Sequence, residues 1–226
     1  MRLALFDLDH TLIPFDSGMA WTRFLIERDA LEPGFEAVYL ALCQQYVAGT
    51  IGIEALHRAS VAPLARHPHA VLARWAQEFE MRMAPRLPAG SRAVVARHRE
   101  AGELCVLVTA TTRFIAEPFA RLFGIAHVLA TEAERIDDRL TGEIDGLPCH
   151  REHKLQRVNA WLATAGLHLQ AFERSWFYSD SAGDLPLLQA VTHPVAVRPD
   201  ARLRAHALQH GWPIVDMDVE PSHAAR

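Results

Sequence analysis

The sequence predicts an α/β fold in which a doubly wound parallel sheet forms the core and a helical domain is inserted after the first strand. Short apolar runs of strand length alternate with segments of helical periodicity through most of the chain, which is typical of a parallel sheet with helices on both faces. Residues 15–85 interrupt this alternation, because they show helical periodicity and no strand pattern. Half of the 226 residues are hydrophobic, so the chain can bury the core that such a fold requires.

Five apolar runs have the length and composition of buried strands. They are Leu3–Leu8, Leu104–Thr109, Trp176–Asp180, Pro194–Val197 and, more weakly, Ile214–Val215. A further segment, Arg139–Gly146, alternates in polarity and contains two glycines, which predicts a hairpin or an edge strand.

Helical segments lie between these strands. They are Ala89–Ala101, Arg113–Phe123, Glu152–Ala165, Leu185–Ala190 and Ala201–His210. Gly102, Gly124 and Gly166 directly follow the first three, as expected of glycines that end a helix in the left-handed conformation.

The segment between Pro14 and Pro85 predicts four helices, because its apolar residues recur at i, i+3 and i+4. The apolar faces are Trp21, Phe24 and Leu25; Phe35, Val38, Tyr39 and Leu42; Ile53 and Leu56; and Val71, Leu72, Trp75 and Phe79. We expect residues 15–85 to form a helical cap domain, and residues 1–14 and 86–226 to form the α/β core. In the alternative interpretation, these helices belong to the main layers around the sheet.

Composition and charge exclude several classes of protein. Acidic residues outnumber basic residues by 27 to 23, a net charge of −4, which argues against a nucleic-acid partner. Cys43, Cys105 and Cys149 stand alone, which predicts neither a zinc ribbon nor a disulfide scaffold. No apolar run approaches the roughly 18 residues that span a bilayer, and Asp7 and Asp9 come before a signal-type stretch can form. We therefore expect a cytoplasmic protein with no membrane partner.

Polar residues stand where three of the predicted strands end. Asp7, Thr109 and Asp180 occupy these positions, and in an open parallel sheet ligands bind beyond the carboxyl ends of the strands. Asp9 is two residues after Asp7 and therefore faces the same side of an extended chain. Two carboxyl groups this close suit a nucleophile or metal ligand paired with a general acid, and Asp180 could supply an oxygen to Mg²⁺.

Single motifs of this kind have ordinary explanations as well. Asp184 stands where it could cap a helix, Thr109 could be a β-branched strand residue, and Lys154 could be a solvated helix lysine. Taken together and in their order along the chain, four motifs are specific. The motifs are Phe6-Asp7-Leu8-Asp9-His10-Thr11-Leu12, then Val108-Thr109-Ala110, then Lys154, and then Ser179-Asp180-Ser181-Ala182-Gly183-Asp184-Leu185-Pro186. They resemble the haloacid dehalogenase-like (HAD) hydrolase superfamily in its phosphoserine-phosphatase-like branch, subfamily IB.

The resemblance implies a Rossmann-like core with a C1-type helical cap, and it implies a role for each motif residue. Asp7 would be the nucleophile that forms an aspartyl-phosphate, and Asp9 would donate and later accept the proton. Lys154 would complete the catalytic set. Thr109 and Ala110 would bind the phosphoryl group, Asp184 would orient the site, and Mg²⁺ would be held by Asp7, the backbone carbonyl of Asp9 and Asp180.

Several residues depart from the pattern of that branch. His10 stands where a small residue or glycine is common, and His153 stands where glycine is common. Asp16 matches the position of a glutamate that meets the substrate ammonium in phosphoserine phosphatases. Arg113 is interpreted as a second substrate-binding residue, with a solvated helix arginine as the alternative, and Arg58 is a weaker candidate for a carboxylate contact.

The thirteen histidines do not predict a metal site, because His150 and His153 beside Cys149 lack partners at matching spacing.

The sequence therefore predicts a Mg²⁺-dependent phosphatase acting on a small phosphomonoester. A phosphotransferase with an acceptor other than water and a non-catalytic binding module of the same fold stay open as alternatives. The substrate stays open between phosphoserine and histidinol phosphate or another amino-alcohol phosphate. A homodimer formed through the cap stays open as well.

Overall fold

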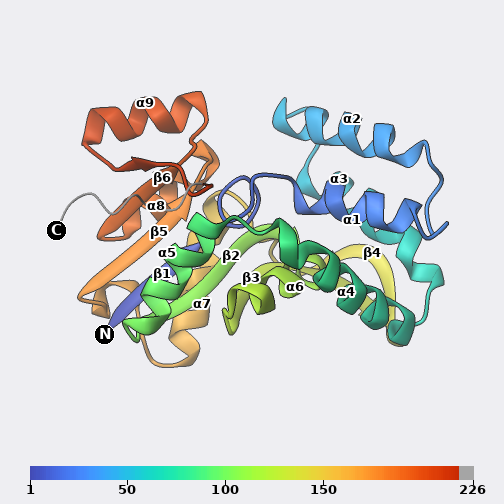
Figure 1. Cartoon of the computed structure of the whole chain (residues 1–226), viewed down its shortest axis with the longest axis horizontal. Helices are drawn as coiled ribbons and strands as arrows, with labels where there is room; N and C mark the ends of the chain where they lie inside the picture. Colours follow the sequence, from blue (N-terminus) through green and yellow to red (C-terminus); the bar gives the residue numbers. More distant parts are fainter. Residues whose placement is uncertain (219–226) are drawn as a thin grey trace.

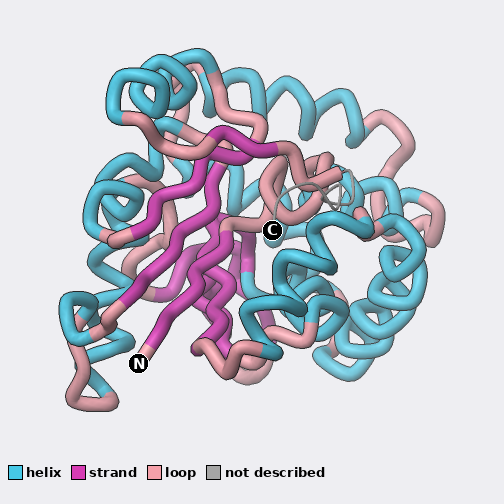
Figure 2. The backbone as a smooth tube through the Cα atoms, turned by 60° about the vertical axis from the view of Figure 1, so that its left-hand side comes forward, coloured by secondary structure: helices cyan, strands magenta, loops and turns pink. Residues whose placement is uncertain are grey.

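A computed structural model describes residues 1–218 of the chain as one seven-stranded sheet with helices on both faces (Figures 1 and 2). The strands are β1 (Arg2–Phe6), β2 (Leu104–Thr112), β3 (His127–Ile136), β4 (Arg139–Asp145), β5 (Arg174–Ser179), β6 (His193–Val197) and β7 (Ile214–Val215). The α-helices are α1 (Ser17–Ile26), α2 (Phe35–Val47), α3 (Ile53–Val61), α4 (His69–Met83), α5 (Ala89–Glu100), α6 (Arg113–Phe123), α7 (Glu152–Thr164), α8 (Leu185–Ala190) and α9 (Ala201–His210). The predicted α/β class is confirmed.

The strand order β4-β3-β2-β1-β5-β6-β7 places β1 between β2 and β5. Every neighbouring pair is parallel except β3 and β4, which form an antiparallel hairpin. In the register of the central strands, Leu5 lies opposite Val106 on one side and Phe177 on the other. The carboxyl ends of β1, β2 and β5 therefore lie side by side.

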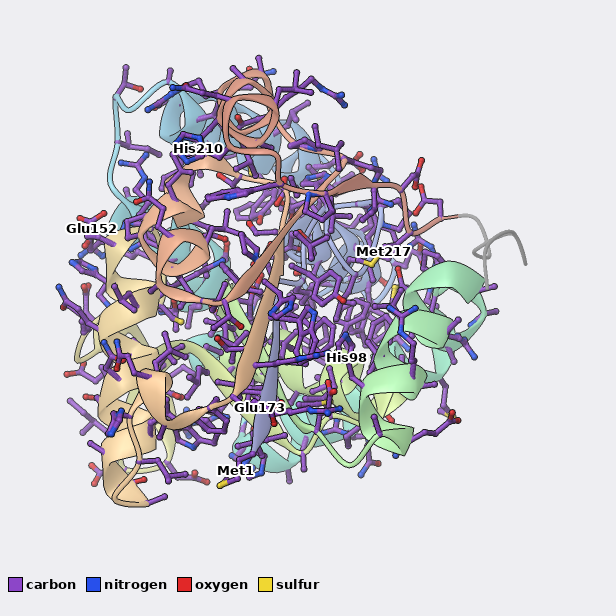
Figure 3. The ribbon with its side chains drawn as sticks, turned by 90° about the vertical axis from the view of Figure 1, so that its left-hand side faces the viewer. Met1, His98, Glu152, Glu173, His210 and Met217 are labelled. Atoms are coloured by element: carbon purple, nitrogen blue, oxygen red, sulfur yellow. The ribbon has the colours of Figure 1, made fainter. Side chains whose placement is uncertain are left out.

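The sheet separates two apolar layers. Successive side chains of β1 point to opposite faces, so that Ala4 and Phe6 pack on one side, and Leu3 and Leu5 on the other. The first layer contains α5, α6 and parts of α1 and α4, and the second contains α7, α8 and α9. Figure 3 shows α5 with His98 and α7 with Glu152 on opposite sides of the sheet.

Residues 15–85, which we call the helical insert, carry α1 to α4 and lie at one end of the molecule (Figure 1). Aromatic rings join the insert to the core. The Phe79 ring of α4 is 5.1 Å from Trp21 of α1 and 5.7 Å from Phe119 of α6, and it is fully buried. Such edge-on aromatic contacts add to the stabilisation from burial. The insert is therefore packed directly against α6.

A second contact joins α3 of the insert to the β3–β4 hairpin. Buried His57 lies 3.1 Å from the Thr112 hydroxyl and 3.2 Å from the Glu143 carbonyl oxygen. Gly142 has φ +96°, and a Cβ there would approach the Cα of Ala62 to 3.2 Å. Glycine at this point of β4 permits both the backbone conformation and the close approach. The hairpin predicted at Arg139–Gly146 thus serves as a platform for the insert.

Some elements differ from the sequence-based expectation. Strand β3 is not predicted, because many of its side chains are polar and its pairing comes from β2 and β4 rather than from its own pattern. Helix α2 does not bury the expected apolar face: of its residues only Tyr39 is buried, and Val38 is 51% exposed. The polar tail predicted after Asp218 lies outside the described residues. In the described part of the chain, none of the helices has the length and apolarity to cross a membrane.

Replacing Phe79 with alanine should remove the aromatic contact between the insert and α6. We expect the free energy of unfolding to fall by about 3–5 kcal/mol, the range found for buried phenylalanines, as measured by urea denaturation. Val47→Ala on α2 is the control, because Val47 is 82% exposed and its truncation should change the stability by less than about 0.5 kcal/mol. A loss below about 1 kcal/mol for Phe79→Ala would contradict this packing role.

Candidate active site

The two predicted carboxylates at adjacent strand ends do converge. Asp7 directly follows β1 and donates its backbone N–H to the Tyr178 carbonyl of β5 at 3.0 Å, and Asp180 directly follows β5. The Thr11 hydroxyl lies 3.2 Å from Asp7 Oδ2 and 3.2 Å from Asp180 Oδ1. Neighbouring parallel strands thus bring together two side chains that are 173 positions apart in the chain.

The turn after Asp9 explains one departure of the sequence from the family pattern. His10 has φ +57°, a left-handed conformation in which glycine is favoured over other residues. Its side chain is exposed, and its carbonyl accepts a hydrogen bond from the Arg198 guanidinium at 2.9 Å. Arg198 also binds the Thr11 carbonyl at 3.0 Å, so an arginine that follows β6 holds this turn.

Lys154 of α7 is buried between two carboxylates. Its Nζ atom lies 2.7 Å from Asp7 Oδ1 and 2.7 Å from Asp184 Oδ2, and its side chain is only 4% exposed. Burial lowers the pKa of Lys154, but the charges of Asp184 and Asp7 raise it by more, so the ammonium form persists. Lys154 is also the only lysine in the chain, which has 22 arginines. Lys154, which the family resemblance places in the catalytic set, is thus paired with Asp7.

Asp184 occupies the N-cap position of α8 but makes no side-chain capping hydrogen bond. Its Oδ2 atom instead accepts hydrogen bonds from Lys154 and from the Ser179 hydroxyl, both at 2.7 Å. The Asp184 side chain therefore does not cap α8, as the alternative interpretation would require. Asp184 thus provides the second carboxylate acceptor for the Lys154 ammonium.

The donor atoms at Asp7 and Asp180 fit a hard divalent cation. Burial and the nearby charge of Asp7 raise the pKa of Asp180 to about 8. The single Thr11 hydroxyl proton cannot satisfy both carboxylates at once. Mg²⁺ takes one or two carboxylates and completes its shell with water and other oxygens.

No convergent cluster of three or more His, Cys, Asp or Glu side chains suited to a metal occurs within residues 1–218. His150, His153 and Cys149 therefore make no such cluster. The two carboxylates of Asp7 and Asp180 are the acidic side chains that could contribute to a magnesium site.

Asp9 is held by two residues that the sequence reasoning missed. Its Oδ1 accepts the Ser17 backbone N–H at 2.6 Å, and its Oδ2 accepts the Thr111 hydroxyl at 2.5 Å. Burial and the charge of Asp16 raise the pKa of Asp9 against these hydrogen bonds, which lower it. The carboxyl group is therefore suited to carrying a proton. Thr111 lies two residues beyond Thr109 on β2, and side chains at this spacing point to the same face of a strand. This spacing could have identified Thr111 from the sequence.

Thr109 is buried at the end of β2, and its hydroxyl oxygen accepts the Thr111 N–H at 3.1 Å. Its own hydroxyl proton is left for a further acceptor. Ala110 follows, with its carbonyl accepting the Thr131 hydroxyl at 2.8 Å. Thr109 and Ala110 thus lie on the strand next to the one that carries Asp7.

Asp16 is the N-cap of α1 and lies on the same side of the site as Asp9. Its Oδ1 accepts the Met19 N–H at 2.6 Å and the Tyr39 hydroxyl at 3.2 Å. Its negative charge raises the pKa of Asp9, as a nearby carboxylate should, after the larger effect of burial. The insert therefore brings one fixed carboxylate to the edge of the cluster.

The two candidate arginines are bound to other groups. Arg113 donates to Glu132 at 2.6 and 2.8 Å and to the Val128 carbonyl at 2.9 Å. Arg58 forms a two-pronged ion pair with Glu143, with distances of 2.7 and 2.6 Å. Arg113 is thus engaged by Glu132 and Val128, and Arg58 by Glu143, and a role for either arginine in substrate binding stays a prediction.

Comparison with known proteins shows which family the chain resembles. The model of the haloacid dehalogenase-like hydrolase family matches residues 4–189. A protein named histidinol-phosphatase from Neisseria meningitidis serogroup C is 40% identical over 220 residues, which cover 95% of this chain and 98% of that protein. Phosphoserine phosphatase SerB1 from Mycobacterium tuberculosis is 32% identical over 226 residues, covering 96% of this chain and 71% of that protein.

Solved structures resemble the chain as well. The crystal structure of a protein of unknown function from Bordetella pertussis Tohama I has a TM-score of 0.89 and 45% identity, over 96% of this chain and 98% of that one. A substrate-bound phosphoserine phosphatase complex has a TM-score of 0.67 and 17% identity, over 96% and 93% of the two chains. The second likeness supports the fold alone.

Replacing Lys154 with methionine should leave Asp7 and Asp184 as buried carboxylates without a counter-charge. We expect the metal-free protein to lose about 3–5 kcal/mol of unfolding free energy at neutral pH, the cost of breaking a buried ion pair. The loss should shrink as the pH falls, because protonated carboxyl groups need no counter-charge. Arg74→Met, which removes an exposed partner of Glu78, should change the stability by less than about 1 kcal/mol. Equal effects of the two substitutions in urea denaturation would contradict this role of Lys154.

Proposed function

The chain belongs to the haloacid dehalogenase-like hydrolase family, and on this basis we propose that it is a Mg²⁺-dependent phosphatase that hydrolyses a small phosphomonoester through an aspartyl-phosphate on Asp7. The observation that carries the proposal is the convergence of Asp7, Asp180 and the buried ammonium of Lys154 at the carboxyl ends of β1 and β5. This arrangement combines an anionic nucleophile, which can receive a phosphoryl group, with a positive charge that can pair with the phosphoryl oxygens.

In the first half-reaction, a carboxylate oxygen of Asp7 attacks phosphorus and the bond from phosphorus to the ester oxygen breaks. The Lys154 ammonium donates a hydrogen bond to Asp7 Oδ1 and so places a positive charge beside the transferring phosphoryl group. An alkoxide is a poor leaving group, so the Asp9 carboxyl donates its proton to the departing oxygen. The alcohol leaves, and phosphorus stays bonded to Asp7.

In the second half-reaction, water attacks the phosphorus while Asp9, now a carboxylate, accepts a proton from it. The bond between phosphorus and the Asp7 oxygen breaks, which regenerates the carboxylate beside Lys154 and releases phosphate. The Thr109 hydroxyl donates a hydrogen bond to a phosphoryl oxygen, since its oxygen already accepts the Thr111 N–H.

The charge at this edge of the sheet supports the requirement for a cation. Asp7, Asp9, Asp180 and Asp184 supply four carboxyl groups, and Lys154 supplies one positive charge. A bound Mg²⁺ would neutralise charge on the transferring phosphoryl group. Asp7 and Asp180 would hold it, with the Asp9 carbonyl as the third protein ligand that the family resemblance implies.

The site favours an amino-alcohol phosphate such as histidinol phosphate over phosphoserine. Asp16 supplies a fixed carboxylate for an ammonium group. Phosphoserine carries an additional carboxylate, and Arg58, the insert cation considered for it, is engaged by Glu143. The relative that is 40% identical over nearly its full length is named histidinol-phosphatase, which supports the same substrate.

A panel of metabolite phosphates assayed with Mg²⁺ tests this proposal. We expect kcat/KM for histidinol phosphate to exceed that for phosphoserine by about tenfold or more, the equivalent of one lost charge contact, and Asp7→Asn to abolish hydrolysis of every ester. Asp16→Asn should reduce kcat/KM for histidinol phosphate about tenfold and leave that for p-nitrophenyl phosphate, which has no ammonium, nearly unchanged.

Activity that survives in Asp7→Asn, or no hydrolysis of any ester by the wild type, would overturn the proposed chemistry. A preference for phosphoserine would overturn the substrate assignment alone. Phosphate found on added acceptor alcohols in place of free phosphate would identify the protein as a phosphotransferase.

Binding of the phosphate analogue vanadate should depend on Mg²⁺, because the carboxyl cluster alone repels an anion. Mg²⁺ must also displace the proton of Asp180, whose pKa lies at about 8 in the metal-free protein. The affinity for Mg²⁺ should therefore increase up to tenfold for each unit by which the pH rises toward about 8, and it should level off above that pH. Titration calorimetry measures this affinity. Asp180→Asn should weaken Mg²⁺ binding and remove this pH dependence. Tight vanadate binding in excess chelator would contradict the requirement for a cation.

A further inference from the structure

The Asp9 carboxyl group is held from two separate parts of the fold. Oδ1 accepts a hydrogen bond from the backbone N–H of Ser17, the first residue of α1 in the helical insert. Oδ2 accepts one from the hydroxyl of Thr111, which is near the end of β2 in the core. The hydroxyl oxygens of Ser17 and Thr111 are 3.1 Å apart, so the three residues close a ring of hydrogen bonds.

The direction of each hydrogen bond in this ring follows from the number of protons. Thr111 has one hydroxyl proton and directs it to Asp9, so the fully buried Ser17 hydroxyl donates to the Thr111 oxygen. Each carboxyl oxygen of Asp9 thus has a fixed donor, which sets the orientation of the carboxyl plane. The backbone N–H of Thr111 is bonded to the Thr109 hydroxyl oxygen. Thr111 therefore connects the acid–base carboxyl to the residue that would contact the phosphoryl group.

We propose that Thr111 is a positioning residue for acid–base catalysis by Asp9, and that Ser17 makes this positioning depend on the helical insert. The inference rests on the proposed phosphatase function. Thr111 exchanges no proton with the substrate. It holds the Asp9 carboxyl where its proton reaches the ester oxygen as the bond to phosphorus breaks, and where the carboxylate then accepts a proton from the attacking water. A small misplacement of a catalytic group has a large kinetic cost.

The chain offers a matched control in the next residue. Thr112 is a buried threonine at the end of β2, next to the half-buried Thr111, but its hydroxyl is bonded to His57 of the insert and not to Asp9. Removing either hydroxyl takes one hydrogen bond from the junction between core and insert. Only Thr111→Val removes a hydrogen bond from the proposed general acid.

The leaving group separates positioning from general damage. An alkyl ester requires a proton on its leaving oxygen, whereas p-nitrophenolate is a stable anion and leaves without one. The ratio kcat/KM includes only the steps up to release of the alcohol, so it reports this protonation and not the later attack of water.

We expect Thr111→Val to lower kcat/KM for histidinol phosphate, or for another alkyl phosphate that the wild type hydrolyses, by about 10- to 100-fold, part of the 10²–10⁴-fold effect of a general acid. The value for p-nitrophenyl phosphate should fall by less than about threefold. Thr111→Ser, which keeps the hydroxyl, should restore the alkyl ester to within about threefold of wild type. Thr112→Val should change both esters by the same factor. Ser17→Ala should act in the same direction as Thr111→Val but more weakly, because the Ser17 N–H remains.

A double-mutant cycle on phenyl phosphate, whose leaving group is intermediate, completes the test. In an Asp9→Ala background, Thr111→Val should add less than about a twofold further loss, because a residue that acts through Asp9 has nothing left to position. If Thr111→Val does not fold, Thr111→Ala is compared on the same esters.

Equal losses on the alkyl and p-nitrophenyl esters, failure of Thr111→Ser to rescue, or a full additional loss in the Asp9→Ala background would each overturn the assignment of Thr111. The proposed phosphatase function fails separately, by the absence of ester hydrolysis in the wild type.

Discussion

The buried ion pairs of Lys154 are the interaction on which the rest of the site depends. One ammonium group lies 2.7 Å from both Asp7 and Asp184, and without it two carboxylates would be buried without a counter-charge. The chain uses arginine at its 22 other basic positions and lysine only here. A compact ammonium can fit between two carboxylates and direct separate protons to each, whereas a planar guanidinium is larger and has a fixed geometry. The one lysine therefore stands where a point charge is needed.

The same ion pairs determine what the site still lacks. The Lys154 ammonium is bonded to Asp7 and Asp184, and its charge only partly offsets the effects that disfavour the ionised form of Asp180. The raised pKa of Asp180 is the consequence, since burial and the Asp7 charge both disfavour its ionised form. A divalent cation would relieve this repulsion and attract the phosphate dianion. Charge at this one edge of the sheet, rather than the net charge of −4, therefore decides what the protein can bind.

The helical insert takes part in the site through a few short contacts. Its first helix supplies the Ser17 N–H to Asp9 and places Asp16 beside it, while its third helix is fastened to the β3–β4 hairpin. The Asp9 carboxyl is consequently held by both insert and core, whereas Asp7 and Lys154 belong to the core alone. Under the proposed function, protonation of the leaving group takes place at the junction of insert and core, and phosphoryl transfer at the edge of the sheet.

Local periodicity and ordered motifs were enough to predict the α/β class and the bounds of helices such as Arg113–Phe123. They also gave the candidate site residues Asp7, Asp9, Thr109, Lys154 and Asp180 in their order along the chain. The sequence did not reveal β3, which is stabilised by pairing with its neighbours. It also did not show that Arg113 is engaged by Glu132, or that Ser17 and Thr111 hold Asp9. Those contacts join residues far apart in the chain, and only the packing of the insert against the sheet decides which polar groups meet.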